Sequence, residues 1–172
     1  MSGLTTLGIA HTAIAVVAVA AGAADLLRHR RIALSGGLGQ LYFWATVLTC
    51  LTGFGIFQHG GFGKPHMLGI FTLLVLAAVQ LGARTTALGR AAPYVTTLGL
   101  SFSFFLHWIP GLTETFTRVP VEAPLFSGPE DPALQQAVGL LFLVFLVGAA
   151  LQWRMLLAEL RGAAPLGAAA AR

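Results

Sequence analysis

The chain has 172 residues, of which 56% are hydrophobic and only 9% are charged, and its formal net charge is +4. This composition is typical of integral membrane proteins and excludes a soluble globular domain. The basic residues flank apolar segments and form no stripe, so we do not expect nucleic-acid binding. The single cysteine excludes an intrachain disulfide and a multi-cysteine metal site.

Five apolar segments are long enough to cross a bilayer, which takes about 17–25 residues. In chain order they cover about residues 4–27, 41–57, 66–83, 91–109 and 133–157. The first lacks a preceding basic segment and is followed by Arg28-His29-Arg30-Arg31, so we interpret it as a retained helix and not as a signal peptide. Because a backbone in hydrocarbon must satisfy its own hydrogen bonds, all five segments are predicted to be helices.

These segments predict an all-α integral membrane protein, with five transmembrane helices in a compact up-and-down bundle. The bundle forms a single domain over residues 1–161. The alanine-rich residues 162–172 are predicted to be a disordered tail.

The basic residues are distributed asymmetrically between the two sides that this arrangement creates. Eight of them share one side, namely Arg28, Arg30, Arg31, Arg84, Arg90, Arg154, Arg161 and Arg172, whereas Lys64 and Arg118 fall on the other. Short loops rich in Lys and Arg stay cytoplasmic. The pattern therefore predicts an external N-terminus, a cytoplasmic C-terminus and a location in the bacterial inner membrane, with the turn at 58–65 and a loop from Gly111 to Pro132 outside.

Four of the five histidines converge on the outer half of the predicted bundle. His11 lies roughly 10 Å below the outer surface at about 1.5 Å per residue, and His107 lies a few residues before Pro110, where the fourth helix is expected to end. His66 opens the third helix, and His59 precedes it in the turn. Ionisable side chains within a membrane are costly and usually face the bundle interior, so His11, His66 and His107 are candidate functional residues.

Helical spacing indicates which side chains accompany these histidines. On the first helix one face carries mostly small residues, namely Gly8, His11, Ala15, Ala18, Gly22 and Asp25. Small residues allow close helix packing in a membrane. Asp25 and Gln80 extend this polar interior toward the cytoplasmic side.

Three interpretations of the histidines stay open. His11 and His107, from separate helices at similar depth, could supply the two imidazoles of a six-coordinate haem b. The phenylalanines expected around that pocket are Phe102, Phe104 and Phe105. Alternatively, His11, His66 and His107 could hold Zn or Cu with an open fourth position, or contribute to a quinone site. In the third interpretation no cofactor binds, and His11 and His107 only make interhelical hydrogen bonds.

The predicted function is electron transfer or cofactor handling in the lipid bilayer, with quinol, a periplasmic protein or a larger respiratory complex as partner. One alternative is a non-catalytic accessory subunit that packs on a membrane complex through its first helix, and a further one is a metal-dependent hydrolase with Glu114 as base. Whether the protein is an enzyme stays open. Helical spacing also predicts ion pairs between Asp25 and Arg28 and between Glu114 and Arg118.

Three stretches of the middle third of the chain carry a family resemblance. They are His29-Arg30-Arg31, Gly37-Leu38-Gly39-Gln40-Leu41-Tyr42-Phe43, and Gly60-Gly61-Phe62-Gly63-Lys64-Pro65-His66-Met67-Leu68-Gly69-Ile70. The order of a basic hinge, a Gly-x-x-Tyr helix start and a turn into a helix that opens with histidine resembles a family of uncharacterised small polytopic bacterial membrane proteins. The resemblance implies an inner-membrane protein and no particular activity. The chain departs from the pattern at Gly36-Gly37, and Thr113-Glu114-Thr115 has no counterpart in it.

Overall fold

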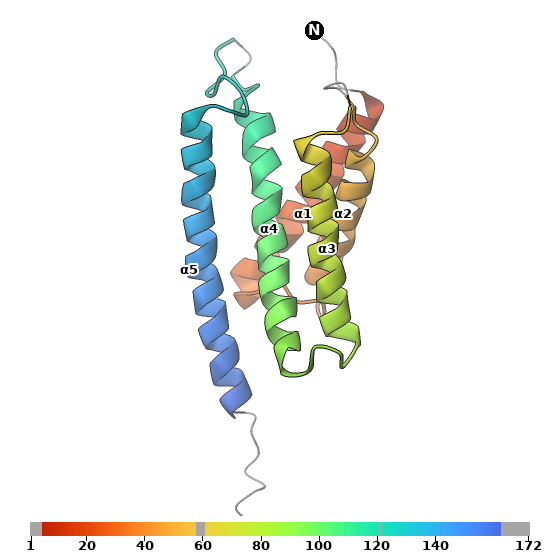
Figure 1. The fold of residues 1–172 in the computed structure, drawn as a ribbon, viewed down its shortest axis with the longest axis vertical. Coiled ribbons are helices and arrows are strands. Elements are labelled where there is room, and N and C mark those ends of the chain that lie inside the picture. Colours follow the sequence, from red (N-terminus) through yellow and green to blue (C-terminus); the bar gives the residue numbers. More distant parts are fainter. Residues whose placement is uncertain (1–4, 58–60, 121, 163–172) are drawn as a thin grey trace, which may run out of the picture.

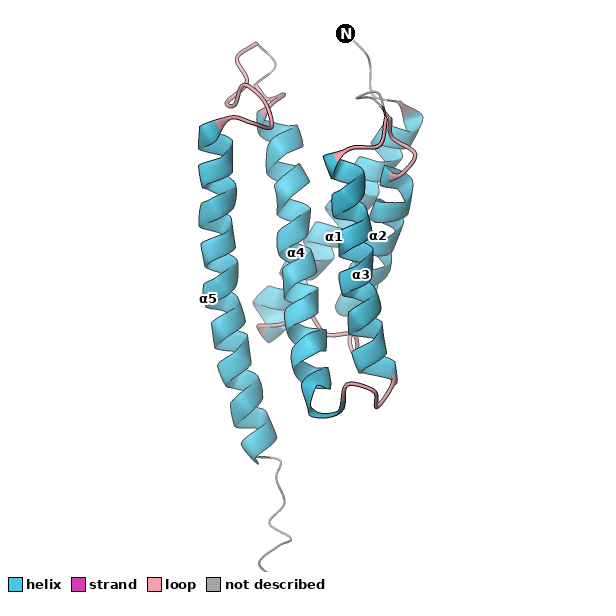
Figure 2. Cartoon of the chain, viewed as in Figure 1, coloured by secondary structure: helices cyan, strands magenta, loops and turns pink. Residues whose placement is uncertain are grey.

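The computed structural model describes residues 5–57, 61–120 and 122–162, and within them it contains five α-helices and no strand (Figures 1 and 2). The helices are α1 (Thr6–His29), α2 (Gly37–Gly53), α3 (Lys64–Arg84), α4 (Ala92–Phe116) and α5 (Pro132–Gly162), and a short 3₁₀ turn, η1 (Gly89–Ala91), precedes α4. The all-α prediction is therefore confirmed. Helices α1, α3, α4 and α5 are long and apolar enough to cross a membrane, which supports an integral membrane protein.

Helix α2 begins four residues earlier and ends four residues earlier than predicted. Gly36, in an extended conformation, precedes its first turn, and Gly39 is buried against the preceding connection. A Cβ atom at Gly39 would overlap the carbonyl oxygen of Ala33, so only glycine fits there. The glycines that read as a loop in the sequence are thus the first turn of the helix, because they let it start in close contact with the α1–α2 connection.

Helix α4 continues through Pro110 to Phe116, so the prediction that it ends near residue 109 is wrong. The predicted loop from Gly111 to Pro132 shrinks accordingly to the stretch between Phe116 and Pro132. Proline removes one backbone donor, a loss that membrane helices tolerate where hydroxyl side chains help to satisfy the backbone. In the turn that follows Pro110, Thr113 donates its hydroxyl hydrogen to the carbonyl of Ile109 at 2.8 Å.

The other helix ends lie closer to the prediction. Helix α1 begins and ends two residues later, α3 gains two residues at its start and one at its end, and α5 begins one residue earlier. Asp131 precedes α5 and accepts the backbone N–H of Ala133 at 2.9 Å, as a helix-capping side chain does. Helix α5 then continues to Gly162, five residues beyond its predicted end, and residues 163–172 of the predicted tail lie outside the described residues.

Adjacent helices pack in the order α1, α2, α3, α4 and α5, with α5 resting mainly on α4 (Figure 1). The α1–α2 and α3–α4 connections lie at one end, which we call the arginine-rich end, and the α2–α3 and α4–α5 connections lie at the opposite end. The described arginines at or near the first of these ends are Arg28, Arg30, Arg31, Arg84, Arg90, Arg154 and Arg161.

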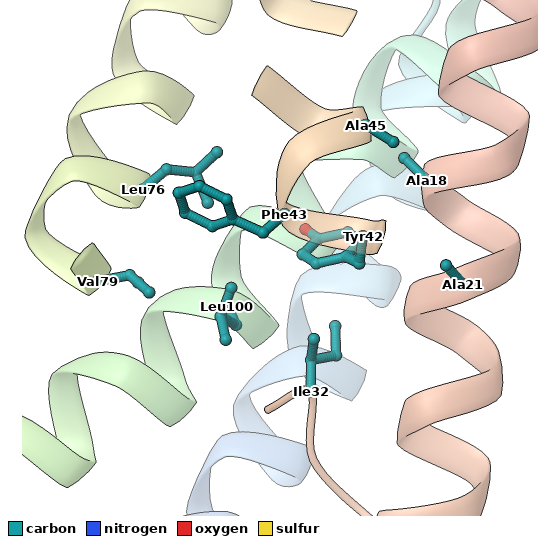
Figure 3. Packing of buried hydrophobic residues seen from close by; sticks show 9 residues of the cluster. All are labelled: Ala18, Ala21, Ile32, Tyr42, Phe43, Ala45, Leu76, Val79 and Leu100. Carbon is teal, nitrogen blue, oxygen red and sulfur yellow. The ribbon is translucent and has the colours of Figure 1, made fainter. Parts of the chain in front are cut away.

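The best-packed part of the molecule lies between α1, α2, α3 and α4 (Figure 3). Its buried cluster consists of Ala18, Ala21, Ile32, Tyr42, Phe43, Ala45, Leu76, Val79 and Leu100. The small-residue face predicted on α1 is confirmed at Gly8, Ala18, Gly22 and Asp25, all of which are buried. Since short side chains allow backbones to approach closely, this face brings α1 onto α2 and positions the side chains described next.

Candidate functional site

His11, in the second turn of α1, reaches across to Thr52 of α2. Its Nδ1 lies 3.0 Å from the Thr52 hydroxyl oxygen, and that hydroxyl lies 2.8 Å from the carbonyl oxygen of Leu48. A carbonyl can only accept, so the single hydroxyl hydrogen is donated to Leu48 and the hydroxyl oxygen accepts from the imidazole. His11 therefore carries its proton on Nδ1 and presents the lone pair of Nε2.

His107 of α4 makes the equivalent contact with Thr46, six residues nearer the start of α2. Its Nε2 lies 3.0 Å from the Thr46 hydroxyl oxygen, and that hydroxyl donates to the carbonyl of Tyr42 at 2.7 Å. The Thr46 hydroxyl has one hydrogen, which it donates to Tyr42, so its oxygen accepts from the imidazole and Nε2 of His107 is the donor. His107 therefore presents the lone pair of Nδ1.

Tyr42 and Ser103 form a buried polar pair beside His107. The Tyr42 hydroxyl lies 2.6 Å from Ser103 Oγ, which itself donates to the carbonyl of Leu100 at 2.8 Å. The Tyr42 ring stands edge-on to the His107 ring, with centroids 6.1 Å apart. Since Tyr42 and Ser103 are fully buried, they fix the wall against which the imidazole lies.

A glycine near the end of α2 makes room for the other imidazole. A Cβ atom at Gly53 would lie 3.3 Å from Cε1 of His11, closer than an ordinary contact. Thr46 and Thr52 are six residues apart, or about 9 Å along the helix at about 1.5 Å per residue. Six residues also turn an α-helix by about 600°, so the two threonines lie about 120° apart around α2. Two imidazoles from different helices thus contact α2, and each keeps one unprotonated nitrogen.

His66 lies apart from this pair, at the start of α3. Its Nδ1 accepts the backbone N–H of Gly63 at 3.3 Å, so its proton lies on Nε2. Its ring stacks against phenylalanines of the same end of the molecule, with centroid distances of 5.1 Å to Phe57, 5.2 Å to Phe62 and 6.5 Å to Phe54. Nε2 is buried and has no hydrogen-bond partner within the described residues. His66 is therefore a donor and not a ligand in this arrangement.

The three predicted ligands are consequently not gathered into one metal site. Within residues 5–57, 61–120 and 122–162, no group of three or more His, Cys, Asp or Glu side chains is arranged to hold a metal ion. His59 lies outside the described residues. Among the histidines that the structure describes, only His11 and His107 each donate to a threonine of α2 and keep an unprotonated ring nitrogen.

Asp25, at the arginine-rich end, has a different partner from the one predicted. Its carboxylate, 2% exposed, accepts from Nδ1 of His29 at 2.7 Å and from the backbone N–H of Ala33 at 2.9 Å. The Asp25–Arg28 pairing is therefore wrong, because a residue four positions later lies on the same helix face and the chain turns back over the carboxylate. Asp25 ties the end of α1 to the connection that follows it.

Other predicted contacts are partly corrected. Phe104 does approach the site, with its ring 6.0 Å from Tyr42, but Phe102 and Phe105 face α5, where their rings lie 5.4 Å and 5.6 Å from that of Phe145. The Glu114–Arg118 pair is confirmed at 2.5 Å. A glutamate paired in this way, without a three-histidine metal group beside it in the described structure, gives no support to the hydrolase alternative.

Comparisons with known proteins identify no relative of this chain. No protein-family model matches it, and neither the curated proteins nor the solved structures contain a significant match.

Proposed function

We propose that this protein is an inner-membrane electron carrier in which His11 and His107 would hold haem b. The observation that carries the proposal is that each imidazole has one nitrogen 3.0 Å from a threonine hydroxyl, and that each hydroxyl in turn lies within hydrogen-bond distance of a helix carbonyl. Histidines that bind metals donate their other ring N–H to a neighbouring acceptor, which fixes the ring and its tautomer. Thr52 and Thr46 act as such acceptors for His11 and His107, at 3.0 Å each.

The number of imidazoles favours haem over Zn or Cu. A tetrahedral zinc site needs three or four protein ligands, whereas haem b needs one imidazole on each face. His66 donates from Nε2 and stacks among phenylalanines, so it adds no third ligand to the pair. A haem b held by these two imidazoles would supply one-electron transfer, and the residues around it would set its potential.

The chain's own residues would set the properties of this site. Thr46 and Thr52 hold the imidazoles in position, and Tyr42 with Ser103 closes the side of the site next to His107. Gly53 gives the His11 ring room to lie against α2. Phe104, which contacts Tyr42, contributes an apolar wall that limits access of water.

The charge distribution supports the proposed orientation in the membrane. Arginines gather at one end of the helices, where short connections rich in Lys and Arg are retained in the cytoplasm. The N-terminus and the ends of α1 and α4 that carry His11 and His107 then face the periplasm of a bacterial inner membrane. Helix α2 is the fifth span: it has 17 residues without a charge, which is near the lower limit of about 17 for crossing a bilayer.

The position of the site near the periplasmic side suggests its electron partners. Quinol in the bilayer or a periplasmic redox protein could reach it, and a larger respiratory complex could accept it as a subunit. His66 supports the first of these partners. Its buried Nε2–H has no hydrogen-bond partner among the described residues and lies beside three phenylalanine rings, and such a donor suits a quinone carbonyl.

The direct test is absorption spectroscopy combined with metal analysis on protein purified in mild detergent after expression with added haem precursor. We expect a Soret band that shifts on reduction with dithionite, and its loss in H11A and in H107A. The matched controls are H29A, which removes a histidine at the opposite end, and H66A; both should keep the low-spin spectrum. If H11A and H107A keep the spectrum, or if the parent protein binds no haem at saturating haemin, the proposal is wrong.

A second candidate function, an accessory subunit of a membrane complex, is favoured by the sparse coverage of α5. Only 6% of its apolar stretch is buried, against 22–33% in α1, α3 and α4. The small-residue face of α1, where we expected the partner to bind, is instead used against α2. A partner would therefore bind α5, and its co-purification in mild detergent with a colourless protein would favour this alternative.

A further inference from the structure

A cavity of about 600 Å³ lies at the arginine-rich end, where parts of all five helices or their connections meet. It is bounded by the α1–α2 connection, the start of α2, the end of α3, the start of α4 and the end of α5. Its volume falls within the range of about 300–1,000 Å³ that is typical of small-molecule sites. It is separate from the histidine pair, none of whose residues line it.

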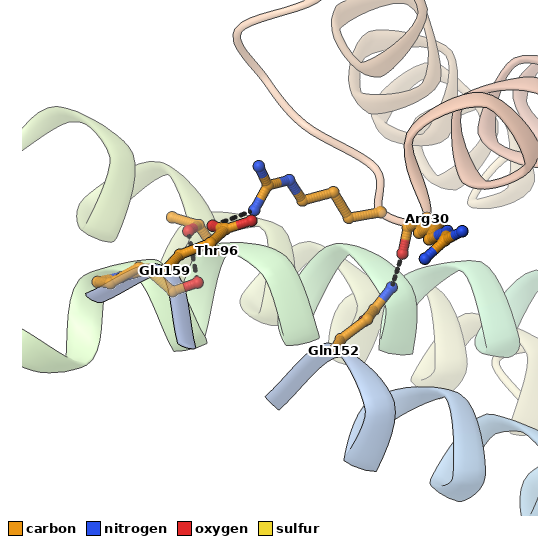
Figure 4. A network of polar contacts seen from close by, with 6 residues as sticks. Arg30, Thr96, Gln152 and Glu159 are labelled. Atoms are coloured by element: carbon orange, nitrogen blue, oxygen red, sulfur yellow. Dashed lines mark hydrogen bonds and ion pairs between the residues drawn. The ribbon is translucent and has the colours of Figure 1, made fainter. Parts of the chain in front are cut away.

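The lining of the cavity is amphipathic. Its deep part is apolar, since Ile32, Leu100 and Leu156 are each at most 3% exposed. The groups nearer the surface are polar or charged, namely Arg31, Ser35, Gln40, Gln80, Arg84, Thr96 and Glu159. Figure 4 shows Thr96 of α4 and Glu159 of α5, which both line the cavity, and Gln152 of α5, which donates to the carbonyl of Arg30 at 3.0 Å. An occupant would need a polar group at the mouth and an apolar part beneath it.

The charges of the lining leave one positive charge unmatched. Arg31 pairs with Glu159 at 2.8 Å, which neutralises both. Arg84 donates only from Nε, to the side-chain oxygen of Gln80 at 3.1 Å. Its two Nη groups make no hydrogen bond or ion pair within the described residues, so they are available to an anion. A guanidinium binds phosphate oxygens through two parallel hydrogen bonds.

We propose that this cavity binds the headgroup of an anionic phospholipid with a single negative charge, such as phosphatidylglycerol. The phosphodiester lies against Arg84 and the paired Arg31, the headgroup hydroxyls meet Gln40 and Gln80, and the start of an acyl chain covers Leu156. Basic pockets between transmembrane helices on the cytoplasmic side are suited to such headgroups. This inference depends on the membrane location and is independent of haem binding, because the two sites share no residue.

The test measures lipid binding to the purified full-length protein by thermal unfolding in detergent, with phosphatidylglycerol and phosphatidylcholine of the same acyl chains as probes. We expect phosphatidylglycerol to stabilise the parent protein at concentrations about tenfold lower than phosphatidylcholine requires. R84Q should weaken phosphatidylglycerol binding by about tenfold or more, the usual effect of removing a hydrogen-bonded charge partner. The control R90Q removes the same charge from the same end, at a residue that does not line the cavity, and should bind as the parent does.

Two further arms distinguish the possible outcomes. R84K keeps the charge but not the planar fork, so it should fall between the parent and R84Q, and it keeps the test valid if R84Q fails to fold. Millimolar inorganic phosphate should not displace the lipid; if it does, the cavity is a phosphate site and the lipid proposal is overturned. Equal losses in R84Q and R90Q, or equal stabilisation by the two lipids, would also overturn it.

Discussion

The threonines of α2 offer a matched pair for testing how the imidazoles are held. Thr46 and Thr49 are both buried, and they donate to the carbonyls of Tyr42 and Ala45 at 2.7 Å and 2.8 Å. Of these two hydroxyl groups, only that of Thr46 also accepts from a histidine ring, that of His107, at 3.0 Å. Valine has nearly the shape of threonine, so T46V and T49V differ mainly in whether an imidazole N–H loses its partner.

The structure sets the size of the expected difference. Side-chain hydrogen bonds between membrane helices contribute about 0.6 kcal/mol on average and at most about 1.7 kcal/mol. A buried donor left without a partner costs about 1–3 kcal/mol, and His107 is half-buried, so the lower part of that range applies. We therefore expect T46V to lose about 1–2 kcal/mol of unfolding free energy. T49V should lose less than about 0.6 kcal/mol, because the carbonyl of Ala45 keeps its helical N–H donor.

The unfolding free energies are measured by SDS titration of the protein in mixed micelles, with helix content followed by circular dichroism. Haem affinity is measured on the same samples. T46V should bind haem about 10–100-fold more weakly than the parent, as expected when the hydrogen-bond partner of a ligand is removed. T49V should bind haem as tightly as the parent does. Equal stability of T46V and T49V would refute the hydrogen bond to His107. Equal haem affinity of the two variants would refute the positioning role of Thr46.

The remaining predictions concern packing and the opposite end of the molecule. G39A should be destabilised by about 1–3 kcal/mol in the same unfolding assay, because the added Cβ would overlap the backbone of Ala33. The control G37A has open space around the added Cβ, so it should be at least as stable as the parent. The ammonium of Lys64 lies 2.6 Å from the Glu130 carboxylate and lowers the pKa of that carboxyl through a hydrogen bond and its charge. In a carboxyl ¹³C NMR titration, K64A should therefore raise the pKa of Glu130 toward the ordinary glutamate value. Because this pKa is lowered in the folded state, the contact should stabilise the loops above the ordinary glutamate pKa and weaken as the pH falls through the lowered value. An unchanged titration of Glu130 in K64A would contradict the ion pair.

The helical class and the asymmetry of charge were predictable because both depend on local composition. A run of about 20 apolar residues has few alternatives to a helix in hydrocarbon, and arginines beside such runs mark their ends. The start of α2 was not predictable in the same way. Gly37 and Gly39 favour a loop by propensity, and the close approach of Gly39 to Ala33, which explains why glycine is needed in this first turn, depends on tertiary structure.

The candidate site was predictable only in part, since it depends on which side chains meet across helices. His11 and His107 stand out because imidazoles are rare inside membranes. The threonines that hold them did not stand out, although Thr46, Thr49 and Thr52 recur every three residues on α2. Threonines in helices usually donate to their own backbone, so spacing alone does not indicate which of them also accepts from a histidine.

The most direct test of the proposed site is the protonation state of the two imidazoles in the cofactor-free protein. In ¹⁵N-histidine NMR of the protein in detergent, we expect His11 to carry its proton on Nδ1 and His107 to carry its proton on Nε2. Added haemin should then shift the signals of His11 Nε2 and His107 Nδ1, the two unprotonated nitrogens. The opposite tautomer at either residue, or haemin binding that leaves the signals of His11 Nε2 and His107 Nδ1 unchanged, would contradict the account.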